Sequence, residues 1–291
     1  MAAVNSRRGS RLLPTVVLIA AAVFFIMPLV AIARFGFQNV PTVLLGWSSL
    51  FKKWTLDGIT GAFRDRNFGP ALGLSVKLAI GTVFGTIGLL LPTAVWVHLK
   101  LPKARGLVEF MTVLPYMVPG IALVAGIKVI QPHARWFLNS PYSLIPYYVV
   151  LALPFTYRSI DAGLRSIDLR TLVDASRSLG AGWGTTLRRV LMPNLRTSLV
   201  SATFLTVAVV LGEFTISSIL LRKTLPVFQA TYRSSSPRGA YALSVLFLLG
   251  TTAVFAVLSL LTRPKSARVK KIDPVVAAVT DEALATQGLA T

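Results

Sequence analysis

The basic connection between two long apolar segments reads Asp174-Ala175-Ser176-Arg177-Ser178-Leu179-Gly180, followed by Val190-Leu191-Met192-Pro193. Asp168 can cap a helix that runs through Leu179. Gly180 can take a positive φ and end that helix, and Gly182 and Gly184 loosen the turn after it. The pattern predicts a short helix, a glycine turn and a second helix over 185–191 that Pro193 stops before the next apolar segment.

Composition places the chain in a membrane. Of its 291 residues 54% are hydrophobic and only 14% are charged, with a mean hydropathy of +0.69. A soluble domain carries more charge, and long apolar runs are typical of polytopic membrane proteins. Cysteine is absent, and His98 and His133 are far apart, so the sequence predicts neither a metal site nor a disulfide. The net charge of +20 indicates contact with membrane lipids rather than nucleic acid.

Apolar runs predict six spans, which we place at 12–33, 71–97, 110–130, 144–157, 195–221 and 240–261. The fourth is short and interrupted by Pro146 and Pro154. The spans are expected to be helices because lipid offers no partner for an open backbone, so the fold class is an all-α membrane protein.

Lys and Arg are more frequent in the connections that lie inside when both termini are cytoplasmic. On this orientation 1–11 is a cytoplasmic N-terminus and 12–33 an uncleaved anchor. The extracytoplasmic loop 34–70 carries Trp47, Phe51 and Trp54, spaced for an interfacial helix. The core 71–262 includes the cytoplasmic loop 158–194, and 263–291 is expected to be a flexible cytoplasmic tail.

At this loop the chain resembles the permease subunits of bacterial ABC importers. Their signature runs Glu-Ala-Ala, three residues, Gly, nine residues, Ile, one residue, Leu-Pro. Here Asp174-Ala175-Ser176 precedes Gly180 by three residues, and Val190 and Met192-Pro193 follow at the family's spacing. Leu114-Pro115 and Val118-Pro119-Gly120 also look like breaks common in this family.

The resemblance implies a six-helix, type I permease in a dimeric pore, with a dimer of ATPase subunits beneath it and an extracytoplasmic solute-binding protein above. The chain has no Gly-x-x-x-x-Gly-Lys-Ser/Thr loop, so it is expected to have no catalytic residue and no cofactor of its own, with ATP bound by the partner. The resemblance implies a cytoplasmic coupling helix in this loop. It assigns contact with the ATPase to Asp174, Ala175, Ser176, Leu179, Gly180, Trp183 and Pro193. Asp174 has two open roles, pairing with a partner's Arg or capping its own helix.

Glu213 is the sharpest candidate for the substrate path, because ionisable groups inside a span often mark one. At helical spacing it shares a face with Thr206, with Val209 or Val210, and with Ser217. The alternatives are a structural ion pair with Lys77 or Lys128, or a hydrogen bond at a gate. The chain looks most like the spermidine/putrescine class, which implies a second, different permease chain. Related branches carry ferric iron, thiamine, aminoethylphosphonate or sulfate.

Two other classes compete with a transport subunit. A membrane-bound enzyme acting on lipid would need clustered His, Cys or paired carboxylates near an interface. Asp161 and Asp168 are seven residues apart, but Arg165 lies between them and favours a salt-bridged helix. A structural or assembly factor would not need the glycine-bounded loop.

Overall fold

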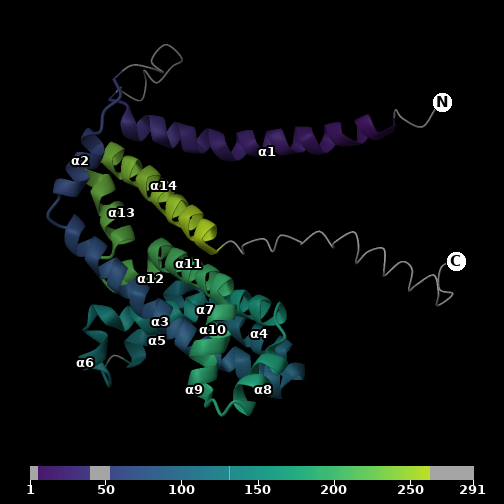
Figure 1. The fold of residues 1–291 in the computed structure, drawn as a ribbon. Coiled ribbons are helices and arrows are strands. Elements are labelled where there is room, and N and C mark those ends of the chain that lie inside the picture. The colour runs from purple at the N-terminus through teal and green to yellow at the C-terminus, as the bar shows by residue number, and fades with distance from the viewer. Residues whose placement is uncertain (1–5, 40–52, 131, 263–291) are drawn as a thin grey trace.

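The computed structural model describes residues 6–39, 53–130 and 132–262, and these form helices joined by short turns (Figure 1). In the described part of the chain the only β-type pairing is an isolated bridge between Gln38 and Trp54. The all-α class predicted from the sequence is confirmed for these residues.

Three long helices make the centre of the molecule: α3 (Phe68–Lys100), α7 (Leu144–Arg165) and α11 (Arg196–Gly212). Because lipid is as apolar as leucine, close packing rather than transfer from water holds such helices together. Small residues allow the close approach: a Cβ added at Gly163 of α7 would overlap Ser198 of α11.

Two buried clusters fill the centre. One joins α3, α7 and α11 to the segment between α7 and α11, and it contains Leu91, Ala94, Tyr157, Ile160, Leu164, Leu169, Val173, Leu191 and Leu195. The other lies toward the opposite end of these helices and contains Leu78, Val124, Ile127, Leu144, Tyr148, Val210 and Ile216.

The first and last long helices lie side by side at one edge. α1 (Ser6–Phe37) meets α14 (Pro237–Thr262) near its C-terminal end, where Phe35 packs edge-on against Tyr241, and the rest of α1 extends away from the body (Figure 1). A third buried cluster ties α14 to α2 (Asp57–Arg64) and α13 (Leu225–Ser235). The predicted positions Trp47 and Phe51 lie outside the described residues, and Trp54 lies in the bridge rather than in a helix.

The third predicted span is broken. It consists of η3 (Pro102–Ala104), α4 (Arg105–Val113) and η4 (Leu114–Met117), and α5 (Gly120–Ile130) then leaves at an angle of 84°. Val118 is extended, with ψ 124°, as a residue before proline prefers, and Pro119 has no N–H to continue the ladder. The span predicted over 110–130 is thus divided at Val118-Pro119-Gly120, one of the two breaks that the resemblance indicates. α6 (Arg135–Leu138) and η5 (Pro141–Ser143) lead on to α7.

The fourth and fifth predicted spans also change. α7 runs unbroken through Pro154 for 22 residues, about 33 Å at 1.5 Å per residue, rather than ending at Tyr157. α11 ends at Gly212, and α12 (Thr215–Ile219) follows after Glu213 and Phe214. By length and composition four helical stretches could cross a membrane, or five if the bent pair is one span, within the residues described; α7 is not among them.

Candidate functional site

The segment between α7 and α11 forms a unit at one end of the molecule (Figure 1). Its first helix is α8 (Leu169–Ser178). Asp168 caps it: the carboxylate accepts from the Thr171 hydroxyl at 2.7 Å and from the Thr171 N–H at 3.3 Å. These hydrogen bonds, the hydroxyl first, hold the pKa of Asp168 below its usual value. Asp168 therefore caps as predicted, and Asp174, in the middle of α8, does not.

Gly180 ends α8 in the way its sequence position predicts. Its φ is +79°, which a residue with a Cβ rarely takes. The N–H of Ala181 donates to the Ser176 carbonyl at 3.1 Å, and the N–H of Gly180 donates to the Arg177 carbonyl at 2.9 Å. This pair of bonds is a Schellman motif, which satisfies carbonyls that a helix end leaves free.

The second arm is longer than predicted. α9 (Trp183–Thr185), the π-helix η6 (Thr186–Leu191) and α10 (Met192–Asn194) follow one another, and the break comes at Leu195. Pro193 lies in the first turn of α10 and does not stop the arm. At the first positions of a helix a proline is tolerated, because its missing N–H would have no intrahelical partner there. We call residues 168–194 the α8–α10 unit.

Ser176 holds the two arms of this unit together. Its hydroxyl lies 2.8 Å from that of Thr186, and both side chains are buried. Ser176 therefore faces into the unit and is not available to a partner protein. The resemblance had grouped it with the residues that contact the ATPase. No spacing rule points to Thr186, so the sequence reasoning missed it.

The outer surface of the unit carries a hydrophobic knob. Leu179 is 89% exposed and Trp183 is 45% exposed, with the Arg177 guanidinium 5.3 Å from the Trp183 ring centre. Asp174, Ala175 and Gly180 are exposed as well. Large apolar side chains held on a rigid turn are the kind of surface that a partner's groove covers.

The two breaks in the long helices meet at a cavity of about 560 Å³. One wall is the α4–α5 bend and the other is the α11–α12 break. The lining residues are Tyr116, Met117, Val118, Pro119, Gly120, Leu151, Ala208, Val209, Gly212, Glu213, Phe214, Thr215 and Ile216. Broken helices that line a cavity are typical of substrate sites in transporters.

Glu213 lies on this cavity with both carboxylate oxygens engaged. Oε1 accepts from the Ile216 N–H at 2.6 Å, and Oε2 accepts from the Ser217 N–H at 3.2 Å and the Tyr148 hydroxyl at 3.1 Å. The carboxylate thus satisfies the first turn of α12, and no ion pair with Lys77 occurs among the described residues. Its geometry is that of the hydrogen-bond alternative.

The other three path candidates point elsewhere. Thr206, Val210 and Ser217 are buried inside the chain, and the Thr206 hydroxyl lies 2.9 Å from that of Thr156 on α7. Val210 is buried in the second cluster, and Ser217 lies on α12. On α11 it is Ala208, Val209 and Gly212 that line the cavity. Of the two valines left open by the sequence, Val209 therefore lines the cavity and Val210 does not. Helical spacing groups residues but does not say which neighbour covers them.

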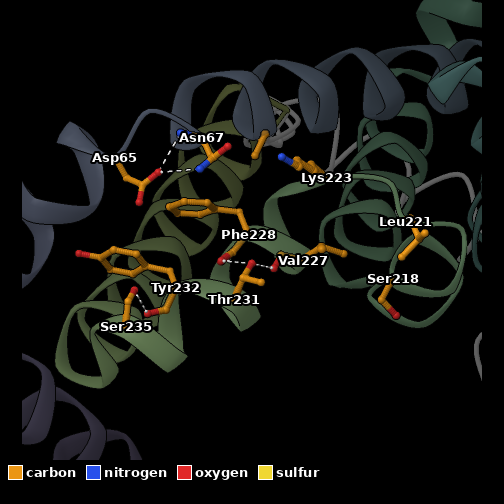
Figure 2. Close-up of a pocket in the computed structure, with 11 residues that line it drawn as sticks. Asp65, Asn67, Ser218, Leu221, Lys223, Val227, Phe228, Thr231, Tyr232 and Ser235 are labelled. Atoms are coloured by element: carbon orange, nitrogen blue, oxygen red, sulfur yellow. Dashed lines mark hydrogen bonds between the residues drawn. The ribbon is translucent and has the colours of Figure 1, made fainter.

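A second hollow of about 450 Å³ lies beside the start of α3 (Figure 2). Asp65 and Lys223 are on its lining, but its polar groups are largely used locally. Asp65 accepts from the Asn67 N–H at 2.8 Å, and the hydroxyls of Thr231 and Ser235 donate to carbonyls of their own helix. We therefore place the candidate site at the α8–α10 unit and the α11–α12 cavity.

Comparison with known proteins covers both the α8–α10 unit and the cavity. A profile of the family described as binding-protein-dependent transport system inner membrane component matches residues 90–265. The sulfate transport system permease protein CysW of Synechocystis sp. is 29% identical over 213 residues, which are 65% of this chain and 74% of that protein.

Two further relatives have other names. The molybdenum transport system permease protein ModB of Mycobacterium tuberculosis is 29% identical over 260 residues, 79% of this chain and 87% of that protein. The spermidine/putrescine transport system permease protein PotB of Escherichia coli is 24% identical over 185 residues, 57% of this chain and 66% of that protein.

Proposed function

The chain belongs to the family of binding-protein-dependent transport system inner membrane components, and on that premise we propose that it forms one half of a pore that imports a small solute by alternating access. It is a permease component of an ABC importer rather than an enzyme, and ATP hydrolysis belongs to separate subunits. The pore has six spans per chain, α7 being one of them, with both termini in the cytoplasm.

The single observation that supports this proposal most is the α8–α10 unit. A capped helix, a left-handed glycine and an internal hydroxyl pair hold Leu179 and Trp183 outward on a rigid support. The ATPase dimer binds this exposed surface. When the dimer closes on ATP, it moves the α8–α10 unit together with the long helices that pack on the unit. A second permease of different sequence completes the pore, and an extracytoplasmic binding protein delivers the solute.

The test is an exposed substitution on the knob. Leu179→Asp is expected to weaken retention of the ATPase subunit on pull-down by about tenfold or more, as loss of a central interface side chain does. The matched control is Leu221→Asp, because Leu221 is 86% exposed and follows α12 at the other end of α11. Equal retention by both variants and the wild type would remove the knob from the interface.

For the cargo we propose a small inorganic oxyanion, with a polyamine as the second candidate. The relatives named for sulfate and molybdenum match at 29% identity, against 24% for the spermidine/putrescine relative. Glu213 favours the polyamine as the charged residue on the cavity lining, but its oxygens already accept three hydrogen bonds. Uptake of labelled sulfate, molybdate, putrescine and spermidine by cells with and without the chain separates the two classes.

A further inference from the structure

Asp161 is a buried carboxylate on which two arginines and a histidine converge. His98 Nε2 lies 2.7 Å from its Oδ1, and the Arg105 guanidinium donates to the same oxygen at 3.1 Å. The Arg165 guanidinium reaches Oδ2 at 2.6 Å. Asp161 itself is 6% exposed. We call these four residues the Asp161 cluster.

The cluster joins three helices at the same end of the molecule. His98 is in the last turn of α3, Arg105 is the first residue of α4, and Asp161 and Arg165 are in the last turns of α7. Removing one member of a buried ion pair leaves an uncompensated charge, so such a carboxylate holds its partners firmly. The Asp161 carboxylate therefore links the end of α7 to α3 and α4, in addition to the packing between these helices.

The α8–α10 unit begins directly after this joint. Arg165 ends α7, and Asp168 caps α8. Leu169 and Val173 of α8 are buried in the same apolar cluster as Ile160 and Leu164, which flank Asp161 on α7. A displacement of α8 consequently reaches the end of α7 at the level of the Asp161 cluster.

We propose that Asp161 is a positioning residue of the import cycle, which ties the α8–α10 unit to α3 and α4. While Asp161 holds His98 and Arg105, a movement of the α8–α10 unit also moves α4 and the α4–α5 bend that lines the cavity. Without this tie, the same movement is absorbed where α7 joins α8. The inference rests on the proposed function, because it needs an ATPase that moves the unit.

The experiment compares Asp161→Asn with the wild type in the reconstituted importer, containing the ATPase, the second permease and the binding protein. Solute uptake and ATP hydrolysis are measured together, with the member of the sulfate, molybdate, putrescine and spermidine panel that the wild type takes up. The variant is expected to move several times less solute per ATP than the wild type, because ATPase movement no longer reaches the cavity. Asp161→Glu, which keeps the charge, is expected to recover part of this loss.

The matched control is Glu109→Gln. Glu109 and Arg158 form an ion pair at 3.0 Å between the same two helices, α4 and α7, but both side chains are exposed. This variant should keep the wild-type ratio of solute to ATP. If Asp161→Asn does not assemble, Arg105→Gln takes its place, since Asp161 then keeps His98 and Arg165.

A merely structural role for Asp161 predicts fewer assembled complexes with an unchanged ratio of solute to ATP, and that result overturns the inference. A different result contradicts the proposed function itself: in the wild-type complex the binding protein does not stimulate ATP hydrolysis, and none of the four solutes is taken up. A second measurement is independent of cargo: spin labels at Leu107→Cys on α4 and Ser178→Cys on α8 report the distance between them. ATP binding should leave that distance unchanged in the wild type and change it in Asp161→Asn; equal behaviour of the two counts against the tie.

Discussion

At the scale of single residues, backbone geometry decides what two prominent positions do. Gly180 has open space around a would-be Cβ, so its constraint is the positive φ and not crowding. Glu213 has an acidic side chain inside a helical span. Its carboxylate accepts hydrogen bonds from the N–H groups of Ile216 and Ser217 and from the Tyr148 hydroxyl. The residue that looks most like a substrate ligand is thus first of all a helix cap.

Glu213→Gln separates these roles. A glutamine has one acceptor oxygen for three donors, so a backbone N–H of α12 loses its partner, at a cost of about 1–3 kcal/mol of stability. Thermal unfolding in detergent measures this loss, with Ser218→Ala of the same helix as the control. For an oxyanion cargo, uptake per assembled complex should stay close to wild type. A selective loss of putrescine or spermidine uptake would instead assign the carboxylate to a cation path.

At the scale of elements, α8 is a short helix whose two ends are both specified locally. Asp168 begins it and the Schellman motif at Gly180 finishes it. A ten-residue helix has little stability by itself in water. Its caps and the buried side chains of Leu169 and Val173 together stabilise α8. The unit therefore presents Leu179 on a firm support.

Asp168→Ala should raise the rate of amide hydrogen exchange in peptides covering 169–178, because the Thr171 N–H loses its acceptor. Asp174→Ala, which removes a carboxylate from the middle of the same helix, is the control and should exchange as the wild type does. The lowered pKa of Asp168 means that the cap is fully present above the unfolded value of 3.8 and is lost as pH falls through the folded value. After correction for intrinsic exchange, the rates should not depend on pH between about 6 and 8; a cap that weakens in this range contradicts the assignment.

At the scale of the whole molecule, the α8–α10 unit and the α12–α13 segment lie at opposite ends of the long helices (Figure 1). If the unit faces the cytoplasm, the hollow beside α13 faces outward. This arrangement agrees with the excess of Lys and Arg in the connections predicted to be inside.

Single cysteines test the orientation cleanly, since the chain has none of its own. Ser178→Cys on α8 and Ser235→Cys on α13 replace exposed serines. A membrane-impermeant maleimide added to intact spheroplasts should label Cys at position 235 and leave position 178 unlabelled until the membrane is opened. The reverse pattern would invert the proposed topology.

Much of this protein is determined by its sequence alone, wherever the cause is local. Hydropathy fixes the apolar helices, Asp168 and Gly180 fix the ends of α8, and proline chemistry prepares the break at Pro119, because each effect acts within a few residues of chain. The cooperation of Asp161 with Arg165, one helical turn away, belongs to the same class.

Only the tertiary structure decided which side of each helix meets which neighbour. It turned Thr206 toward α7 and brought Thr186 to Ser176. It also placed His98 and Arg105 on Asp161, which lies 63 and 56 positions along the chain from them. In addition, it continued α7 through Pro154. The physical reason is that packing and buried charge pairing depend on side chains from other helices, and no spacing within one helix specifies those.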